Sequence, residues 1–248
     1  MADLLIESHP DGLVQIRLNR PDKGNSLTAS IVEDLHDAFD SATASPSTRA
    51  IIFSGEGRHF STGFDLGNLE SSSDEILLHR FIRIELLLQK VRSAPVLTVC
   101  YAHGRTVGAG ADLVVACERR IADCRTTMAF PGSGFGIVLG TGRLASRVGA
   151  GRAQDFVRTG RQIASEEAFS SGLVTNITSD GLTNGLLEEL SKSTGRLDFD
   201  TSIAIAALLM ADNDRDLAAL VRSGARPGLG TRISAYRLAA IQNRLREN

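Results

Sequence analysis

The sequence contains no tryptophan, only three cysteines and no long run of apolar residues. Cys100, Cys117 and Cys124 are odd in number and lack C-x-x-C spacing, which favours reduced thiols in a cytoplasmic protein. No apolar stretch approaches the roughly 18 residues that a membrane span requires. The N-terminal residues lack the basic and apolar regions of a signal peptide. We therefore expect a cytoplasmic protein that does not enter membranes.

Neither sign of charge dominates the chain, whose formal net charge is −2 with lysine and arginine spread along its length. A nucleic-acid-binding surface would need a concentrated basic stripe, so we expect no nucleic-acid partner. The histidines are scattered, and none stands at metal-ligand spacing from a cysteine or a carboxylate. We therefore expect no structural metal.

What the chain does contain is a succession of short apolar segments and amphipathic segments. Its 248 residues suit one large domain, or one domain with a helical appendage. Thr28 is a candidate N-cap for a helix that runs to about Thr43. The other predicted elements are strands over 4–8, 13–18, 50–54, 95–100 and 119–122, and helices over 74–92 and 108–117.

After about residue 140 the pattern is almost wholly helical. Strand–loop–helix units followed by helices predict an α/β core over residues 1–195 and a helical region over residues 196–248. The expected interruptions between the two parts are residues 178–182 and 193–199.

Two glycine-containing turns each follow a predicted buried strand. The first runs from Gly57 to Leu66, and the second runs from His103 to Leu113 and opens a helix. The start of a helix offers unpaired N–H groups at its positive end, which suits a developing negative oxygen. Small residues let a ligand carbonyl approach the backbone, and two amides aimed at one point make an oxyanion hole. Taken alone, each turn is better explained by turn geometry, because glycine between a strand and a helix usually serves only the turn.

Two other motifs are incomplete. Gly108-Ala109-Gly110 matches part of a dinucleotide-binding fingerprint, but the full G-x-G-x-x-G is absent. Ser133 lies between two glycines without the G-x-S-x-G frame of a nucleophile elbow.

Several segments together carry a likeness to one protein family. They are Phe60–Leu66, Gly104 with Val107–Leu113, Asn19–Leu27, Cys117–Ala122 and Glu167–Val174. In this combination they resemble the crotonase superfamily, the enoyl-CoA hydratase/isomerase family, over about residues 3–180.

The resemblance implies a spiral of ββα units that forms two roughly perpendicular sheets, with C-terminal helices that mediate assembly into a homotrimer or homohexamer. It also implies that an acyl-coenzyme A (CoA) thioester is bound and that two backbone amides polarise its carbonyl. Carried over position by position, these amides belong to Phe64 and Ala109. CoA would be part of the substrate, and no separate cofactor is implied. The implied CoA contacts are Lys23, Gly24, Asn25, Ser26, Thr62, Leu66 and Gly108.

The sequence departs from its family at the catalytic carboxylates. Hydratases of the family use two glutamates around one water as general base and general acid. The first position holds Asp112, whose shorter side chain moves the reactive oxygen, and the second holds Gly132, which cannot transfer a proton. Asp112 also stands where a helix start favours an acidic residue for capping alone. Asp65 is interpreted as structural, holding the first turn through side-chain hydrogen bonds to the backbone.

Three functions remain open from the sequence. The first is an enoyl-CoA hydratase or isomerase in which Asp112 moves the proton and the oxyanion hole stabilises an enolate. The second is another reaction on the same platform, such as decarboxylation, thioester hydrolysis or C–C cleavage; decarboxylation needs little acid chemistry. The third is an acyl-CoA-binding or scaffolding protein without catalysis.

Overall fold

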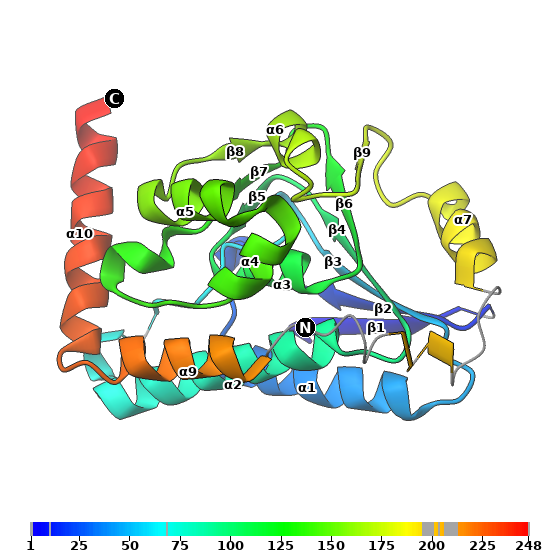
Figure 1. Cartoon of the computed structure of the whole chain (residues 1–248), viewed down its shortest axis with the longest axis horizontal. Helices are drawn as coiled ribbons and strands as arrows, with labels where there is room; N and C mark the ends of the chain where they lie inside the picture. Colours follow the sequence, from blue (N-terminus) through cyan, green and yellow to red (C-terminus); the bar gives the residue numbers. More distant parts are fainter. Residues whose placement is uncertain are drawn as a thin grey trace.

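The chain folds into a mixed α/β structure with two sheets, shown in Figure 1. This computed structural model describes residues 2–9, 11–67, 69–194, 201–202, 204–205 and 213–247. The larger sheet has six strands in the order β1-β2-β3-β4-β6-β9, and the smaller has three in the order β5-β7-β8. The α/β fold expected from the sequence is confirmed.

The large sheet is parallel except at one edge. The strands predicted over 4–8 and 13–18 form a hairpin there: Leu4–Ser8 (β1) pairs antiparallel with Leu13–Leu18 (β2). The remaining strands pair in parallel, as their crossover helices require. They are Ala50–Gly55 (β3), Leu97–Ala102 (β4), Arg119–Asp123 (β6) and Asn176–Thr178 (β9).

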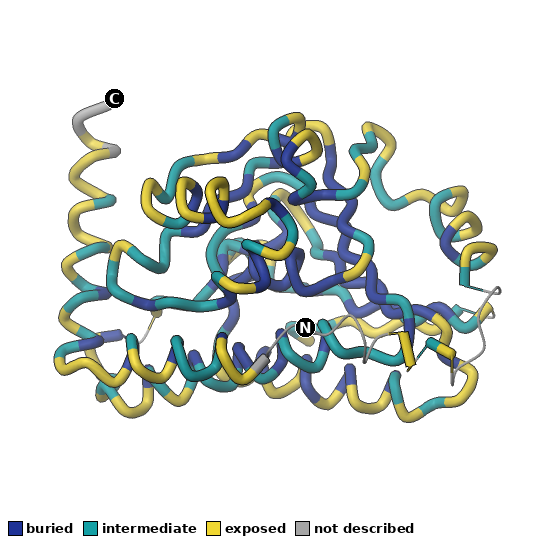
Figure 2. Tube along the Cα trace, in the orientation of Figure 1, coloured by how far each residue is buried: buried dark blue, intermediate teal, exposed yellow. Residues whose placement is uncertain are grey.

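Both faces of this sheet are covered, which is why its central strands are apolar throughout rather than alternating. In β3, Ile51 and Phe53 face one apolar cluster, while Ala50 and Ile52 face another. Helices α1, α2 and α3 are among those that contribute to the first cluster, and α7 covers the second through Leu190. Figure 2 shows the strands and α3 as the buried centre of the molecule. The helices are Ala29–Ala44 (α1), Asp74–Arg92 (α2), Ala109–Ala116 (α3) and Asn184–Thr194 (α7).

Helix starts follow the expected capping chemistry. The Thr28 hydroxyl accepts a hydrogen bond from the Ile31 amide at 3.2 Å, which confirms it as the N-cap of α1. Ser73 caps α2 in the same way through the Ile76 amide. The carboxylate of Asp74, the first residue of α2, also accepts hydrogen bonds from the backbone amides of residues 228–230 at 2.7–3.0 Å. This ties the beginning of the last helix to the core.

The resemblance implied a second sheet, but its strands were not located in the sequence. Its strands are Arg105–Val107 (β5), Thr127–Ala129 (β7) and Ile163–Ala164 (β8). Segments of two or three residues carry no measurable alternation, so no periodicity signals them. The expectation of almost wholly helical structure after residue 140 is wrong at β8 and β9.

The rest of the chain is helical and packs back onto the core. Figure 1 shows α9 lying along α2 and α10 rising from the edge of the molecule. The boundary predicted between residues 195 and 196 falls outside the described residues, so the domain division stays a prediction. The helices are Thr141–Val148 (α4), Ala150–Thr159 (α5), Ser165–Ser170 (α6), Asn213–Gly224 (α9) and Leu229–Glu247 (α10), with short 3-10 helices at Pro21–Lys23 (η1), Leu69–Ser71 (η2) and Pro131–Phe135 (η3).

Candidate active site

The first glycine turn presents the Phe64 amide with no partner in the described protein. Phe64 forms an isolated parallel bridge with Leu27. The bridge uses its neighbours: Leu27 N–H donates to the Gly63 carbonyl at 2.7 Å, and Asp65 N–H donates to the Leu27 carbonyl at 3.0 Å. The N–H and C=O of Phe64 itself therefore point away from Leu27. Among the described residues, none accepts a hydrogen bond from this N–H.

The second turn presents the Ala109 amide at the start of α3. Gly108 precedes it with φ 54° and ψ −127°, a conformation that favours glycine. The Asp112 amide donates to the Gly108 carbonyl at 2.9 Å and closes the first helical turn. Ala109 N–H is thus one of the unpaired donors at a helix start, and no described residue accepts from it. Its position at the positive end of the helix suits a negative oxygen.

The two turns lie against each other through backbone contacts. Val107 N–H donates to the Ser61 carbonyl at 3.0 Å, next to an isolated bridge between Ser61 and Thr106. A Cβ on Gly63 would collide with the Val107 carbonyl oxygen and stand 3.2 Å from the Ala109 nitrogen. A Cβ on Gly110 would stand 2.7 Å from that of Ser61. Only glycine at both positions permits this approach.

Charged and aromatic side chains contact the first turn and stabilise it. The Phe64 ring stacks on Phe81 with 4.2 Å between centroids, and the Arg80 guanidinium lies 4.0 Å from the centre of the same ring. Arg80 also donates to the Asp65 carbonyl at 2.9 Å. The Asp65 carboxylate accepts from the Gly67 amide at 2.8 Å and forms an ion pair with Arg20. The structural role predicted for Asp65 is confirmed.

The loop predicted to contact CoA packs beside this turn. Thr62 N–H and its hydroxyl both donate to the Gly24 carbonyl, at 2.9 and 3.2 Å. Asn25 is fully buried, and its amide side chain donates to two backbone carbonyls of the neighbouring loop. The Ser26 hydroxyl donates to Asp65, whereas Lys23 is exposed. The side chains of Asn25 and Ser26 therefore hold the loop. The CoA contacts at Lys23, Gly24, Asn25, Ser26, Thr62, Leu66 and Gly108 stay predictions.

Asp112 lies one helical turn beyond Ala109 with 6% of its surface exposed. Burial is the main cause that raises the pKa of its carboxyl well above the ordinary value. Arg143 acts in the opposite direction, while Glu85 and Asp216 raise the pKa further. No described residue donates a hydrogen bond to the Asp112 carboxyl. A buried carboxyl with a perturbed pKa, close to unpaired amides, is typical of a catalytic site.

Gly132 lies beside the second turn, but it brings no carboxylate there. Strand β7 pairs in parallel with β5, so the residues after each strand emerge at the same edge. The Gly108 amide donates to the Ala129 carbonyl at 2.9 Å, three residues before Gly132. A Cβ on Gly132 would meet only ordinary contacts at 3.7 and 3.8 Å. The position therefore has room for a side chain that the sequence does not supply.

Sequence reasoning missed three charged residues next to Asp112: Glu85, Arg143 and Asp216. One signal was available, because Glu85 stands among the apolar residues Ile84, Leu87 and Leu88 on the buried face of α2. A charge at such a position usually has a partner inside the protein.

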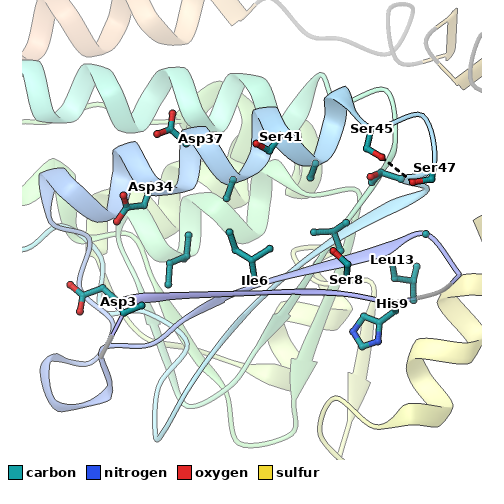
Figure 3. A pocket seen from close by; sticks show the side chains of 17 residues that line it. Asp3, Ile6, Ser8, His9, Leu13, Asp34, Asp37, Ser41, Ser45 and Ser47 are labelled. Atoms are coloured by element: carbon teal, nitrogen blue, oxygen red, sulfur yellow. Dashed lines mark hydrogen bonds between the residues drawn. The ribbon is translucent and has the colours of Figure 1, made fainter.

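A surface hollow of about 860 Å³ lies elsewhere, between β1 and α1. Figure 3 shows Asp3, Asp34 and Asp37 around it, with Ile6 on the strand side. None of the predicted site residues lines it, and its carboxylates would repel the phosphates of CoA.

The described residues contain neither a metal-binding group nor a membrane-spanning helix. Within those ranges, no group of three or more histidine, cysteine, aspartate or glutamate residues could hold a metal ion. No described helix is long and apolar enough to cross a bilayer.

Comparisons with known proteins agree with this geometry. The family model described as Enoyl-CoA hydratase/isomerase matches residues 8–221. The chain belongs to the enoyl-CoA hydratase/isomerase family. The resemblance found in the sequence motifs is therefore confirmed.

Relatives within this family differ in how much of their length is matched. A "Putative enoyl-CoA hydratase" of Thermus thermophilus is 30% identical over 91% of this chain and 85% of its own length. A "Probable enoyl-CoA hydratase" of Bacillus subtilis is 33% identical over 61% of this chain, and the match spans 60% of that relative. A second Bacillus subtilis relative is matched over 64% of its length.

Solved structures of the family share the fold. A "putative enoyl-CoA hydratase/isomerase" from Bordetella parapertussis is 38% identical and superimposes with a TM-score of 0.92 over 95% of this chain and 98% of its own. An enoyl-CoA hydratase from Bacillus halodurans, 23% identical, has a TM-score of 0.81 over 94% of this chain and 100% of its own. At that identity the likeness concerns the fold alone.

The contact between the turns predicts a selective effect of Gly63→Ala. The new Cβ would push the Phe64 and Ala109 amides apart, and a displacement of about 1 Å would lower the rate of a reaction that uses both amides about a hundredfold. Gly149→Ala is the matched control, because Gly149 has φ 80° against 86° for Gly63 but a Cβ there meets nothing within 4 Å. Both variants should lose about 1 kcal/mol of stability from backbone strain. Equal turnover in the two variants, with thermal unfolding measured in parallel, would contradict the role of the contact.

Proposed function

We propose that this protein is an enzyme acting on acyl-CoA thioesters, and that the Phe64 and Ala109 amides form its oxyanion hole. The observation that carries the proposal is the pair of unpaired N–H groups on two turns in contact, with the buried Asp112 one helical turn away. A thioester oxygen placed between the amides would be stabilised as it gains negative charge. Removal of a proton next to the thioester carbonyl creates that charge.

The number of carboxylates selects among the reactions of the family. Hydration needs one group to activate water and another to protonate carbon. Movement of a double bond needs one group that takes a proton and returns it. With Asp112 present and Gly132 at the second position, the site supports isomerisation of an enoyl-CoA best.

Asp112 alone can carry the one proton that the isomerisation moves. In a 3-enoyl-CoA the C2–H bond breaks, its proton goes to the Asp112 carboxylate, and the electron pair moves onto the thioester oxygen as a dienolate. The oxyanion hole stabilises this dienolate. The Asp112 O–H then returns the proton to C4, the carbonyl reforms, and the double bond lies between C2 and C3.

Gly132 also favours a second candidate, decarboxylation of a 2-carboxyacyl-CoA. Loss of carbon dioxide breaks the bond at C2 and leaves its electron pair in the enolate, so no base is needed. Only one proton must then be supplied, and Asp112 is placed to supply it.

We propose further that the protein assembles with copies of itself through α10. Leu238, Ile241 and Leu245 are 60%, 45% and 74% exposed, and their spacing places them on one side of the helix. Figure 1 shows this half of α10 projecting beyond the core. A stripe of large apolar side chains on a projecting helix is typical of a subunit interface. A homotrimer or homohexamer of cytoplasmic subunits without a separate cofactor is the proposed state.

The proposed chemistry predicts that Asp112→Asn abolishes isomerisation. An amide cannot carry the proton, so turnover of a 3-enoyl-CoA should fall by about 10²- to 10⁴-fold. Asp155→Asn is the control, because it removes a carboxylate from an exposed ion pair with Arg161. Mass spectrometry of a panel of enoyl-, 2-carboxyacyl- and other acyl-CoA substrates measures the outcome. Undiminished isomerisation in Asp112→Asn would exclude Asp112, and binding without turnover of any thioester would exclude an enzyme.

The room at Gly132 predicts a gain of hydration. Gly132→Glu should fit without collision and would supply the missing second carboxylate, so water addition to a 2-enoyl-CoA should rise at least about tenfold over wild type. Gly132→Gln has the same size without the carboxylate and should show no rise. A hydration rate that does not differ between the two variants would show that the position does not reach the substrate.

The apolar stripe predicts that Leu238→Glu dissociates the assembly. A charge buried in an apolar interface is costly, so the sedimentation coefficient should fall to that of a monomer at micromolar protein concentration. Asn243→Asp places a negative charge on the opposite side of α10, at an exposed position, and should leave sedimentation unchanged. A wild-type chain that sediments as a monomer would refute the proposed assembly.

A further inference from the structure

Three charged side chains from distant parts of the chain meet in the core next to Asp112. They are Glu85 on α2, Arg143 on α4 and Asp216 on α9, with side chains 0%, 2% and 10% exposed. The two terminal nitrogens of Arg143 donate to the two oxygens of Glu85, at 2.7 and 2.5 Å. Asp216 lies 3.5 Å from Arg143 on another side. We call these three residues the buried charge cluster.

Both carboxylates of the buried charge cluster accept several hydrogen bonds. Asp216 accepts the Gly142 and Arg143 amides at 2.9 and 3.1 Å, so it caps the positive end of α4. Glu85 accepts both Arg143 bonds and a further one from the Gln89 amide at 3.1 Å. Hydrogen bonds to an ionised carboxylate stabilise that form.

The charges in the buried charge cluster do not cancel. One guanidinium faces two carboxylates, which leaves the cluster with a net charge of −1. A carboxylate placed nearby is attracted by Arg143 and repelled by Glu85 and Asp216, in a medium that screens poorly.

Asp112 is the group placed nearby. The point where a Cβ of Gly140 would stand is 3.0 Å from the Asp112 Oδ1 and 3.1 Å from the Arg143 Nη2, so both groups approach the same point. Gly140 has φ 59° and carries no side chain to separate them. Among the described residues, the charges that act on Asp112 come from Arg143, Glu85 and Asp216, on the three helices named above.

We propose that Glu85 and Asp216 are positioning residues for the reaction, whose negative charges keep the transferred proton on Asp112 against the opposing positive charge of Arg143. This inference rests on the proposed function, in which Asp112 carries that proton. Between removal from C2 and delivery to C4, the proton resides on the Asp112 carboxyl. An ordinary carboxylic acid would release it to water, whereas a carboxyl beside a net negative charge retains it. The same charge makes the carboxylate a stronger base toward a weakly acidic C–H bond.

The burial of Asp112 agrees with this assignment, because burial and both carboxylates raise its pKa. The direction in which each substitution moves the pKa of Asp112 follows from these causes. Glu85→Gln keeps one of the two hydrogen bonds from Arg143 but removes one negative charge, so ionisation of Asp112 becomes easier and its midpoint moves to lower pH. Asp216→Asn does the same from a different helix. Because the first proton transfer needs ionised Asp112, the rising limb of the rate against pH should move to lower pH by the same amount.

The experiment is a titration of Asp112 in the full-length protein without substrate. Infrared difference spectra between wild type and Asp112→Asn isolate the C=O stretch of the protonated Asp112 carboxyl. In the wild type this band should persist to a pH well above the ordinary midpoint of about 4. In Glu85→Gln and in Asp216→Asn the ionisation constant of Asp112 should increase about tenfold or more. Glu33→Gln, which breaks the exposed ion pair of Glu33 with Arg83 on α2, should leave the midpoint where it is.

Two outcomes overturn the inference. One is a wild-type Asp112 that ionises in the ordinary range, which needs no variant to be folded. The other is a folded Glu85→Gln or Asp216→Asn protein whose Asp112 midpoint matches that of Glu33→Gln. If instead the spectroscopic midpoint moves but the pH profile of kcat/KM for a 3-enoyl-CoA does not, the cluster controls Asp112 and Asp112 is not the proton carrier. That result would refute the proposed function and leave the electrostatic part of the inference standing.

Discussion

The structure of the candidate site depends on one close approach between two stretches of backbone. Gly63 lies against the backbone of Val107 and Ala109 so tightly that a single methyl group would not fit. Around this contact the loop that contains Asn25 and the Arg80–Phe64–Phe81 stack fix the first turn, while β5 and α3 fix the second. Amides held in this way need no reorganisation when charge develops, which is the physical basis of catalysis by an oxyanion hole.

A structural feature could be predicted from the sequence where its signal lies within one short segment of the chain. The helix at Asp74–Arg92 could be predicted because its cap and its apolar spacing lie within the helix itself. The two turns could be predicted because glycine marks them directly. The short strands β5, β7 and β8 could not, since two or three residues show no period. Nor could the pairing of Arg143 with Glu85, because 58 residues separate partners that only the fold brings together.

Stability alone does not explain why the buried charge cluster lies inside the protein. Removing charged groups from water is costly, and well-packed apolar residues in their place are often as stable or more stable. The three residues are nonetheless buried between α2, α4 and α9. Asp216 caps α4 and so couples the C-terminal helices to the loop that contains Gly140. Fold stability and control of Asp112 thus use the same contacts, which explains why variants must be compared by spectroscopy as well as by rate.

Family membership defines the shared step, which is the stabilisation of an enolate, but the number of proton carriers defines the reaction. A site with two carboxylates can activate water and protonate carbon at once, whereas a site with one must return the proton that it takes or receive an enolate formed by another bond cleavage. In the proposed reaction Asp112 is the one proton carrier, because Gly132 supplies no second carboxylate. A single carrier would also have to keep its proton between two transfers, and the negative charges of Glu85 and Asp216 beside Asp112 would meet that demand. Under this proposal the absence of the second carboxylate and the presence of the buried charge cluster serve the same reaction.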